Sequence, residues 1–145
     1  MERNESRDTA RAVSKENVEL IRRSYDGFNR RDLAATDELL HPDFELDFSN
    51  SLGPERGVYT GEEGLRRVFE PYWDAFDSIS IEPERFIGTA DVIIAVVRAR
   101  GRGKGSGVEV DARGPHMWSF RDGKIVGFRL FQELEEALEA AGLSE

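Results

Sequence analysis

The sequence predicts an α+β fold with a mainly antiparallel sheet, and three observations carry this prediction. Apolar residues recur at helical spacing in the first half of the chain and alternate in the second half. Helices and strands do not alternate along the chain as they do around a parallel sheet. Near the carboxyl end, Asp122-Gly123 separates two apolar runs, which is a strong signal for a two-residue hairpin.

The first two helices are expected before residue 43. Ser14 can cap the first, in which four apolar residues recur at helical spacing: Val18, Ile21, Tyr25 and Phe28. Asp32 can cap a short second helix, and the His41-Pro42 pair would end it because proline cannot continue a helix.

A third helix is expected after a polar loop over residues 49–59. Thr60 and Glu63 match the capping box, in which a hydroxyl and a carboxylate bond each other's backbone amides. Pro71 is expected to kink this helix. Its wide apolar face comprises Leu65, Val68, Phe69, Tyr72, Trp73 and Phe76.

Strands account for most of the remaining chain. The first alternates apolar and acidic residues over 43–48, and Pro83 in the second suggests a sheet edge or a bulge. The strands after the first are expected over 79–87, 92–100, 108–120 and 124–132. A short helix over 133–143 would close the chain, with Gly142 as its stop.

Composition predicts one domain over residues 14–145, preceded by a charged, disordered tail over residues 1–13. The chain has no cysteine, so disulfides and thiolate-based sites are excluded. We expect a cytoplasmic protein, because there is no apolar run long enough for a bilayer and no signal-peptide pattern.

The net charge of −9 argues against nucleic acid as a partner, since such binding depends on cationic contacts to phosphate. The glycine-rich basic stretch over residues 101–107 is a local exception. A phosphate-binding loop should open a helix, whereas a strand follows here. A solvated hairpin tip is therefore the better interpretation of this stretch.

The hairpin at Asp122-Gly123 predicts a register if both strands alternate regularly. Arg121 would pair with Lys124, and one face of the sheet would then carry two further pairs, Trp118 with Gly127 and His116 with Arg129. The other face would carry an apolar patch of Met117, Val126, Phe128 and Leu130. Such a patch predicts a homodimer through the sheet, unless helices of the same chain cover both faces.

Three residues, two of them in this hairpin, are open to more than one interpretation. Trp118 can line a ligand cavity or fill the core. His116 beside Arg129 can belong to a wet pocket, because arginine is rarely buried unpaired, or to a structural polar cluster. Asp47 can act as a desolvated base or be a solvated carboxylate at a strand end.

Four segments resemble the SnoaL-like branch of the nuclear transport factor 2-like superfamily. They are YDGFNRRDL at 25–33, LHPDFELD at 40–47, YTGEEGL at 59–65 and WSFRDGKIV at 118–126. The resemblance covers nearly all of residues 14–132. It implies a cone-shaped, cystatin-like architecture, in which a curved antiparallel sheet wraps the N-terminal helices around a pocket, often in dimers.

The resemblance to ketosteroid isomerases within this superfamily implies roles for two residues. Their general-base aspartate matches Asp47, and their oxyanion-binding acid matches His116. Their helix-one tyrosine matches Ser24 here, with Tyr25 next to it, and this departure speaks against steroid isomerisation itself.

Three hypotheses follow from these residues. The chain can be a cofactor-free isomerase or cyclase, with catalytic residues Asp47, His116 and Arg129 and proton transfer beside a carbonyl. It can instead bind a small apolar molecule, anionic or carbonyl-bearing, without catalysis, or serve as a protein-interaction domain. The residues expected to contact a ligand are Tyr25, Trp73, Trp118, Phe120 and Phe131. No metal and no cofactor are expected, because the two histidines are not at metal-ligand spacing.

Overall fold

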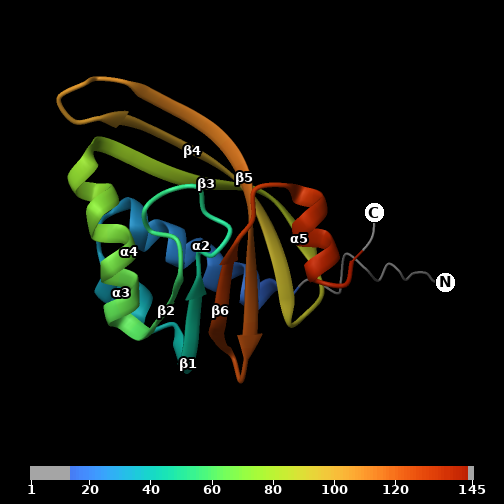
Figure 1. The fold of residues 1–145 in the computed structure, drawn as a ribbon. Coiled ribbons are helices and arrows are strands. Elements are labelled where there is room, and N and C mark those ends of the chain that lie inside the picture. Colours follow the sequence, from blue (N-terminus) through green and yellow to red (C-terminus); the bar gives the residue numbers. More distant parts are fainter. Residues whose placement is uncertain (1–13, 144–145) are drawn as a thin grey trace.

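The computed structural model describes residues 14–143 (Figure 1). Its helices are α2 (Lys15–Asn29), α3 (Leu33–Asp37), α4 (Gly61–Ala75) and α5 (Leu134–Ala140). Its strands are β1 (Leu40–Asp47), β2 (Val58–Thr60), β3 (Phe76–Gly88), β4 (Val92–Gly103), β5 (Glu109–Arg121) and β6 (Lys124–Leu130). The tail predicted over residues 1–13 lies outside the described residues. None of the described helices is long and apolar enough to cross a membrane.

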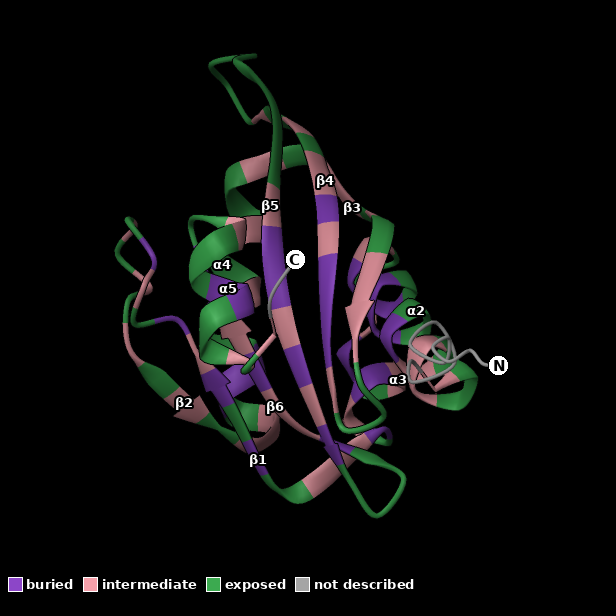
Figure 2. Cartoon of the chain, turned by 90° about the vertical axis from the view of Figure 1, so that its right-hand side faces the viewer, coloured by how far each residue is buried: buried purple, intermediate pink, exposed green. Residues whose placement is uncertain are grey.

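The strands form one six-stranded sheet in the order β2-β1-β6-β5-β4-β3. The pairing of β1 with β6 is parallel, and every other neighbouring pair is antiparallel. The sheet curves around α2, α3 and α4, while α5 lies against the opposite face at β4 and β5 (Figures 1 and 2). The predicted α+β architecture is therefore confirmed.

The helix starts follow the predicted capping chemistry in two of three cases. The backbone amide of Asn17 donates to Ser14 Oγ at 3.1 Å, and that of Ala35 donates to Asp32 Oδ1 at 3.2 Å. Thr60 precedes α4, but its side chain makes no capping hydrogen bond. The predicted capping box is therefore wrong.

Two proline positions test the predicted strands, and one of them differs from the prediction. His41-Pro42 lies within β1, and the second helix already ends at Asp37, so the expectation of a longer second helix is wrong. Pro83 lies in the edge strand β3 at a shift in register, as predicted. An edge position tolerates proline because one side of the strand needs no amide donor.

The Asp122-Gly123 turn is confirmed. Both residues have positive φ angles, of 55° and 75°, and Arg121 pairs with Lys124. Two positive φ angles in sequence define the type I′ turn, whose twist matches that of the flanking strands.

The register beyond this turn differs from the prediction because β6 contains a bulge at Val126. Phe120 pairs with Ile125, but Ser119 pairs with Gly127, so Val126 has no partner on β5. An extra residue of this kind sends every later side chain of its strand to the opposite face. The bulge allows Ile125 and Phe128, three residues apart, both to lie in the core.

The bulge overturns the predicted face assignments on β6. Trp118 pairs with Phe128 rather than Gly127, and His116 pairs with Leu130 rather than Arg129. Phe128 belongs to the main core and Leu130 packs against it, while Met117 packs against a second cluster that includes α5. The patch predicted for a homodimer interface is therefore not formed as a surface.

The first testable prediction concerns the turn. Gly123→Ala should lower the free energy of unfolding by about 1–2 kcal/mol, because a Cβ is disfavoured at a φ of +75°. Gly114→Ala is the matched control, since the space around Gly114 is open and its φ is not in the left-handed region. Urea denaturation of both variants measures the difference. Equal stabilities would contradict the assigned turn conformation.

Candidate functional site

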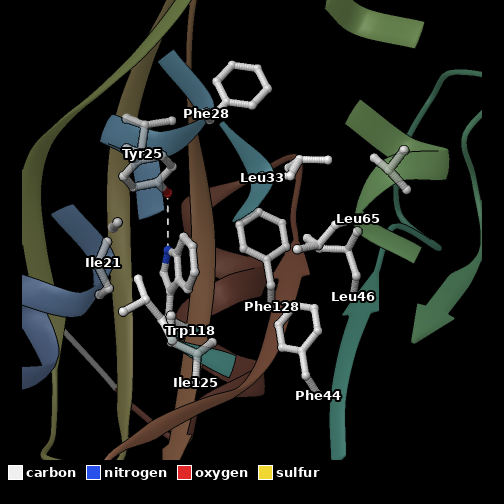
Figure 3. Packing of buried hydrophobic residues seen from close by; sticks show 14 of the residues in the cluster. Ile21, Tyr25, Phe28, Leu33, Phe44, Leu46, Leu65, Trp118, Ile125 and Phe128 are labelled. Carbon is white, nitrogen blue, oxygen red and sulfur yellow. Dashed lines mark hydrogen bonds between the residues drawn. The ribbon is translucent and has the colours of Figure 1, made fainter. Parts of the chain in front are cut away.

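A cavity of about 200 Å³ lies between α2 and the concave face of the sheet. Aromatic side chains from both layers dominate its walls, and Figure 3 shows several of them around Trp118. The aromatic lining comprises Tyr25, Phe28, Phe44, Phe48, Phe69, Tyr72, His116, Trp118 and Phe128. A volume of this size is sufficient for a small ring system, since about 150 Å³ holds benzene.

The cavity lining is electrically neutral. Among the described residues that form its walls there is no lysine, arginine, aspartate or glutamate. A charged ligand would therefore lose its hydration without gaining a counter-ion, which is costly in a medium of low polarity. The site favours a neutral, largely apolar molecule.

Three side chains in this cavity form a hydrogen-bonded chain. Trp118 Nε1–H donates to Tyr25 Oη at 3.1 Å (Figure 3), and Tyr25 Oη lies 2.7 Å from His116 Nδ1. An indole nitrogen only donates, so the tyrosine oxygen accepts from it and directs its own hydrogen to His116 Nδ1. The reverse polarity would leave the buried Tyr25 hydroxyl hydrogen without an acceptor.

This arrangement determines the state of His116. With Nδ1 accepting, the neutral imidazole carries its hydrogen on Nε2. Burial lowers the pKa of His116 from 6.5 to about 4, so the ring is neutral at pH 7. Burial also raises the pKa of Tyr25, which keeps the hydroxyl protonated. The Nε2–H group is then a hydrogen-bond donor with no protein partner in the described part of the chain.

A second polar group lies at another part of the wall. Tyr72, on α4, donates a hydrogen bond from its hydroxyl to Glu55 Oε2 at 2.8 Å. Burial raises the pKa of Glu55, but hydrogen bonds from Ser51 and Tyr72 outweigh it and hold the pKa below its ordinary value. The loop between β1 and β2 is thereby joined to α4 beside the cavity.

Asp47 and Arg129 do not share the cavity with His116. They are paired across β1 and β6, with Arg129 Nε 3.6 Å from Asp47 Oδ2. Both lie on the face opposite Leu46 and Phe128, which line the cavity. The guanidinium of Arg129 also covers the ring of Phe131, 4.7 Å from its centroid.

The five aromatic residues predicted to contact a ligand divide in the same way. Tyr25 and Trp118 line the cavity. Trp73 and Phe120 are buried in the main core without lining it, and Phe131 packs with α5 in the second cluster. The structure therefore brings together three of the predicted site residues, Tyr25, His116 and Trp118.

Sequence reasoning missed Ser24, Phe28 and Phe128 among the cavity residues. Ser24 and Phe28 lie three and seven residues after Ile21, on the helical face that Tyr25 also shares, so periodicity could have identified them. Phe128 could not have been assigned, because its face depends on the bulge at Val126. Within the described chain, no three histidine, aspartate or glutamate side chains are grouped to hold a metal.

The fold and this site define an α+β protein whose curved sheet encloses an apolar pocket. The chain belongs to the SnoaL-like domain family, which it matches over residues 21–128. This confirms the resemblance noted in the sequence. No curated protein matches the chain.

Several solved structures share the fold. TerC, co-crystallised with polyporic acid, has a TM-score of 0.73 and 22% identity, covering 88% of this chain and 98% of its own. A putative SnoaL-like polyketide cyclase from Jannaschia sp. CCS1 has a TM-score of 0.71 and 20% identity, covering 92% and 96%. RV0760c from Mycobacterium tuberculosis, in complex with estradiol-17β-hemisuccinate, has a TM-score of 0.69 and 16% identity. The match covers 84% of this chain and 97% of RV0760c. At these identities the similarity concerns the fold.

Proposed function

We propose that this protein binds a small, neutral, largely apolar molecule that carries a carbonyl or another hydrogen-bond acceptor. The observation that carries the proposal is the hydrogen-bonded chain from Trp118 through Tyr25 to His116. It fixes the imidazole with its hydrogen on Nε2, a donor on a residue that lines a mostly apolar cavity. A few polar groups among aromatic walls select for a ligand that places an acceptor at this donor.

Proton transfer beside a carbonyl, as in an isomerase or cyclase, is the second candidate function. The neutral His116 favours it, because Nε2–H can stabilise a developing enolate oxygen. The proposed base Asp47 lies on the other face of the sheet, next to Arg129 and Ser49. A general base must come within hydrogen-bonding reach of the proton it removes. The geometry therefore supports binding better than this chemistry.

The proposal is tested with matched aromatic probes. We expect 2-tetralone, a bicyclic ketone, to bind about tenfold more tightly than its hydrocarbon parent tetralin, which is the usual worth of one hydrogen bond. The carboxylate 2-naphthoate should bind more weakly than either, because the cavity lining carries no cation. Thermal shift and calorimetric titration measure these affinities.

His116→Phe should abolish the preference for 2-tetralone over tetralin while retaining an apolar cavity. Asp47→Asn is the matched control, and it should leave both affinities unchanged. Loss of the preference in Asp47→Asn but not in His116→Phe would overturn the binding proposal. Turnover of a bound ketone that is lost in Asp47→Asn while binding persists would favour the proton-transfer candidate. A homodimer also stays a prediction, to be measured by sedimentation, and it would need a surface other than the Phe128–Leu130 region.

A further inference from the structure

Ser24 presents a buried hydroxyl whose hydrogen-bonding capacity is unused. Ser24 is 4% exposed and lines the cavity from α2. Ser24 Oγ has no hydrogen-bond partner among the described residues. A serine within a helix commonly bonds the carbonyl one turn earlier, and this one does not. Buried polar atoms are almost always paired, so an unpaired one on a residue that lines a cavity needs an explanation.

Ser24 and His116 approach the cavity from different layers. Ser24 belongs to α2, whereas His116 belongs to β5, and the cavity lies between them. The neighbouring Tyr25 points its hydroxyl to His116 and Trp118, so it is already satisfied and does not compete for Ser24. The helix wall therefore offers Ser24 Oγ, and the sheet wall offers His116 Nε2–H, as polar groups for a ligand.

We propose that Ser24 is the second hydrogen-bonding contact for the ligand and a determinant of its specificity. This inference rests on the proposed function, and it narrows the ligand class. The ligand is a neutral ring compound with two polar groups: an acceptor that meets His116 Nε2–H, and a hydroxyl or carbonyl that meets Ser24 Oγ. A serine hydroxyl both donates and accepts, so either group fits.

Hydroxylated tetralones test the inference. The probes are 2-tetralone and its 5-, 6- and 7-hydroxy derivatives, which move a hydroxyl round the far ring. At least one hydroxy derivative should bind the wild-type protein about tenfold more tightly than 2-tetralone. In Ser24→Ala this advantage should disappear, while 2-tetralone should still bind more tightly than tetralin through His116.

The stability of the free protein gives a second readout. Ser24→Ala should raise the melting temperature without ligand, because it removes an unpaired buried hydroxyl and alanine is the better helix former. A lower melting temperature would show that the hydroxyl has a structural partner, which overturns the inference. Thr36→Val removes another hydroxyl of the same lining. If Thr36→Val abolishes the advantage and Ser24→Ala does not, the assignment to Ser24 is overturned.

The two proposals fail in different ways. If 2-tetralone does not bind the wild-type protein more tightly than tetralin, the proposed role of His116 fails. If it does, but no hydroxy derivative gains affinity, His116 keeps its role and the inference about Ser24 fails. An ordered water that satisfies Ser24 permanently would give this second result.

Discussion

Tyr25→Phe is expected to lower the free energy of unfolding by about 3 kcal/mol, although it removes one oxygen atom. That oxygen accepts from Trp118 Nε1 and donates to His116 Nδ1, and all three side chains are buried. Its removal leaves one donor and one acceptor unpaired, and each such group costs about 1–3 kcal/mol. The aromatic ring is kept, so no large cavity forms.

Tyr59→Phe is the matched control for this variant. Tyr59 donates one hydrogen bond, to the backbone carbonyl of Glu55, from a partly buried position. Its loss should cost about 1 kcal/mol. Urea denaturation followed by far-UV circular dichroism compares the two. A loss in Tyr25→Phe no larger than that in Tyr59→Phe would show that Trp118 and His116 find other partners.

A double-mutant cycle of Tyr25→Phe with His116→Phe tests the coupling directly. The two costs should not add, because His116→Phe already removes the acceptor that Tyr25→Phe leaves unpaired. Tyr25→Phe should also weaken the preference for 2-tetralone over tetralin, since Nδ1 no longer has a donor that places the hydrogen on Nε2. If the losses in unfolding free energy of the two single variants add up in the double variant, Tyr25 and His116 are not coupled.

Stability should fall by about 3 kcal/mol as the pH drops from 7 to about 4, beyond the effect of the carboxylates. The pKa of His116 is about 4 in the folded protein and 6.5 when the ring is solvated. Between these values the unfolded chain binds a proton that the folded chain excludes, so stability rises with pH through this window. Protonation of His116 would also break its hydrogen bond with Tyr25, because a protonated Nδ1 can no longer accept the hydroxyl hydrogen.

Denaturation series at several pH values measure this effect as a difference between variants. His116→Phe should show a pH dependence flatter by about the same 3 kcal/mol, because the titrating group is gone. His41→Phe is the control, since His41 is the other histidine of the chain and lies outside the cavity. Parallel curves for wild type and His116→Phe would contradict a neutral, buried His116.

Local interactions made much of the fold predictable. Ser14 and Asp32 cap their helices through contacts three residues away, and Asp122-Gly123 specifies its turn through its own φ angles. The alternation of Phe44 and Leu46 with acidic residues identified the inner face of β1. Each of these features depends on residues only a few positions apart, so it can be predicted from the sequence.

The candidate site was predictable only in part. His116 and Trp118 were predicted to share one face of the sheet, and both line the cavity, because β5 alternates without interruption from the turn to His116. Tyr25 lines the cavity from α2. Arg129 was assigned to it incorrectly, because β6 is shifted at Val126. Because side chains alternate between the two faces of a strand, a shift of one residue in register places every later side chain on the wrong face.

The sequence alone was enough to predict the family, the caps of the first two helices and the hairpin turn. It did not predict the short strand β2, which begins at the end of the segment expected to be a loop. The tertiary structure decided which side chains meet in the cavity. Ile125 and Phe128 can both enter the core only if β6 bulges between them, and that demand comes from packing against other elements rather than from the neighbouring residues. The same bulge places Arg129 on the face opposite His116. His116 is neutral because it is buried, and its Nδ1 is paired with Tyr25.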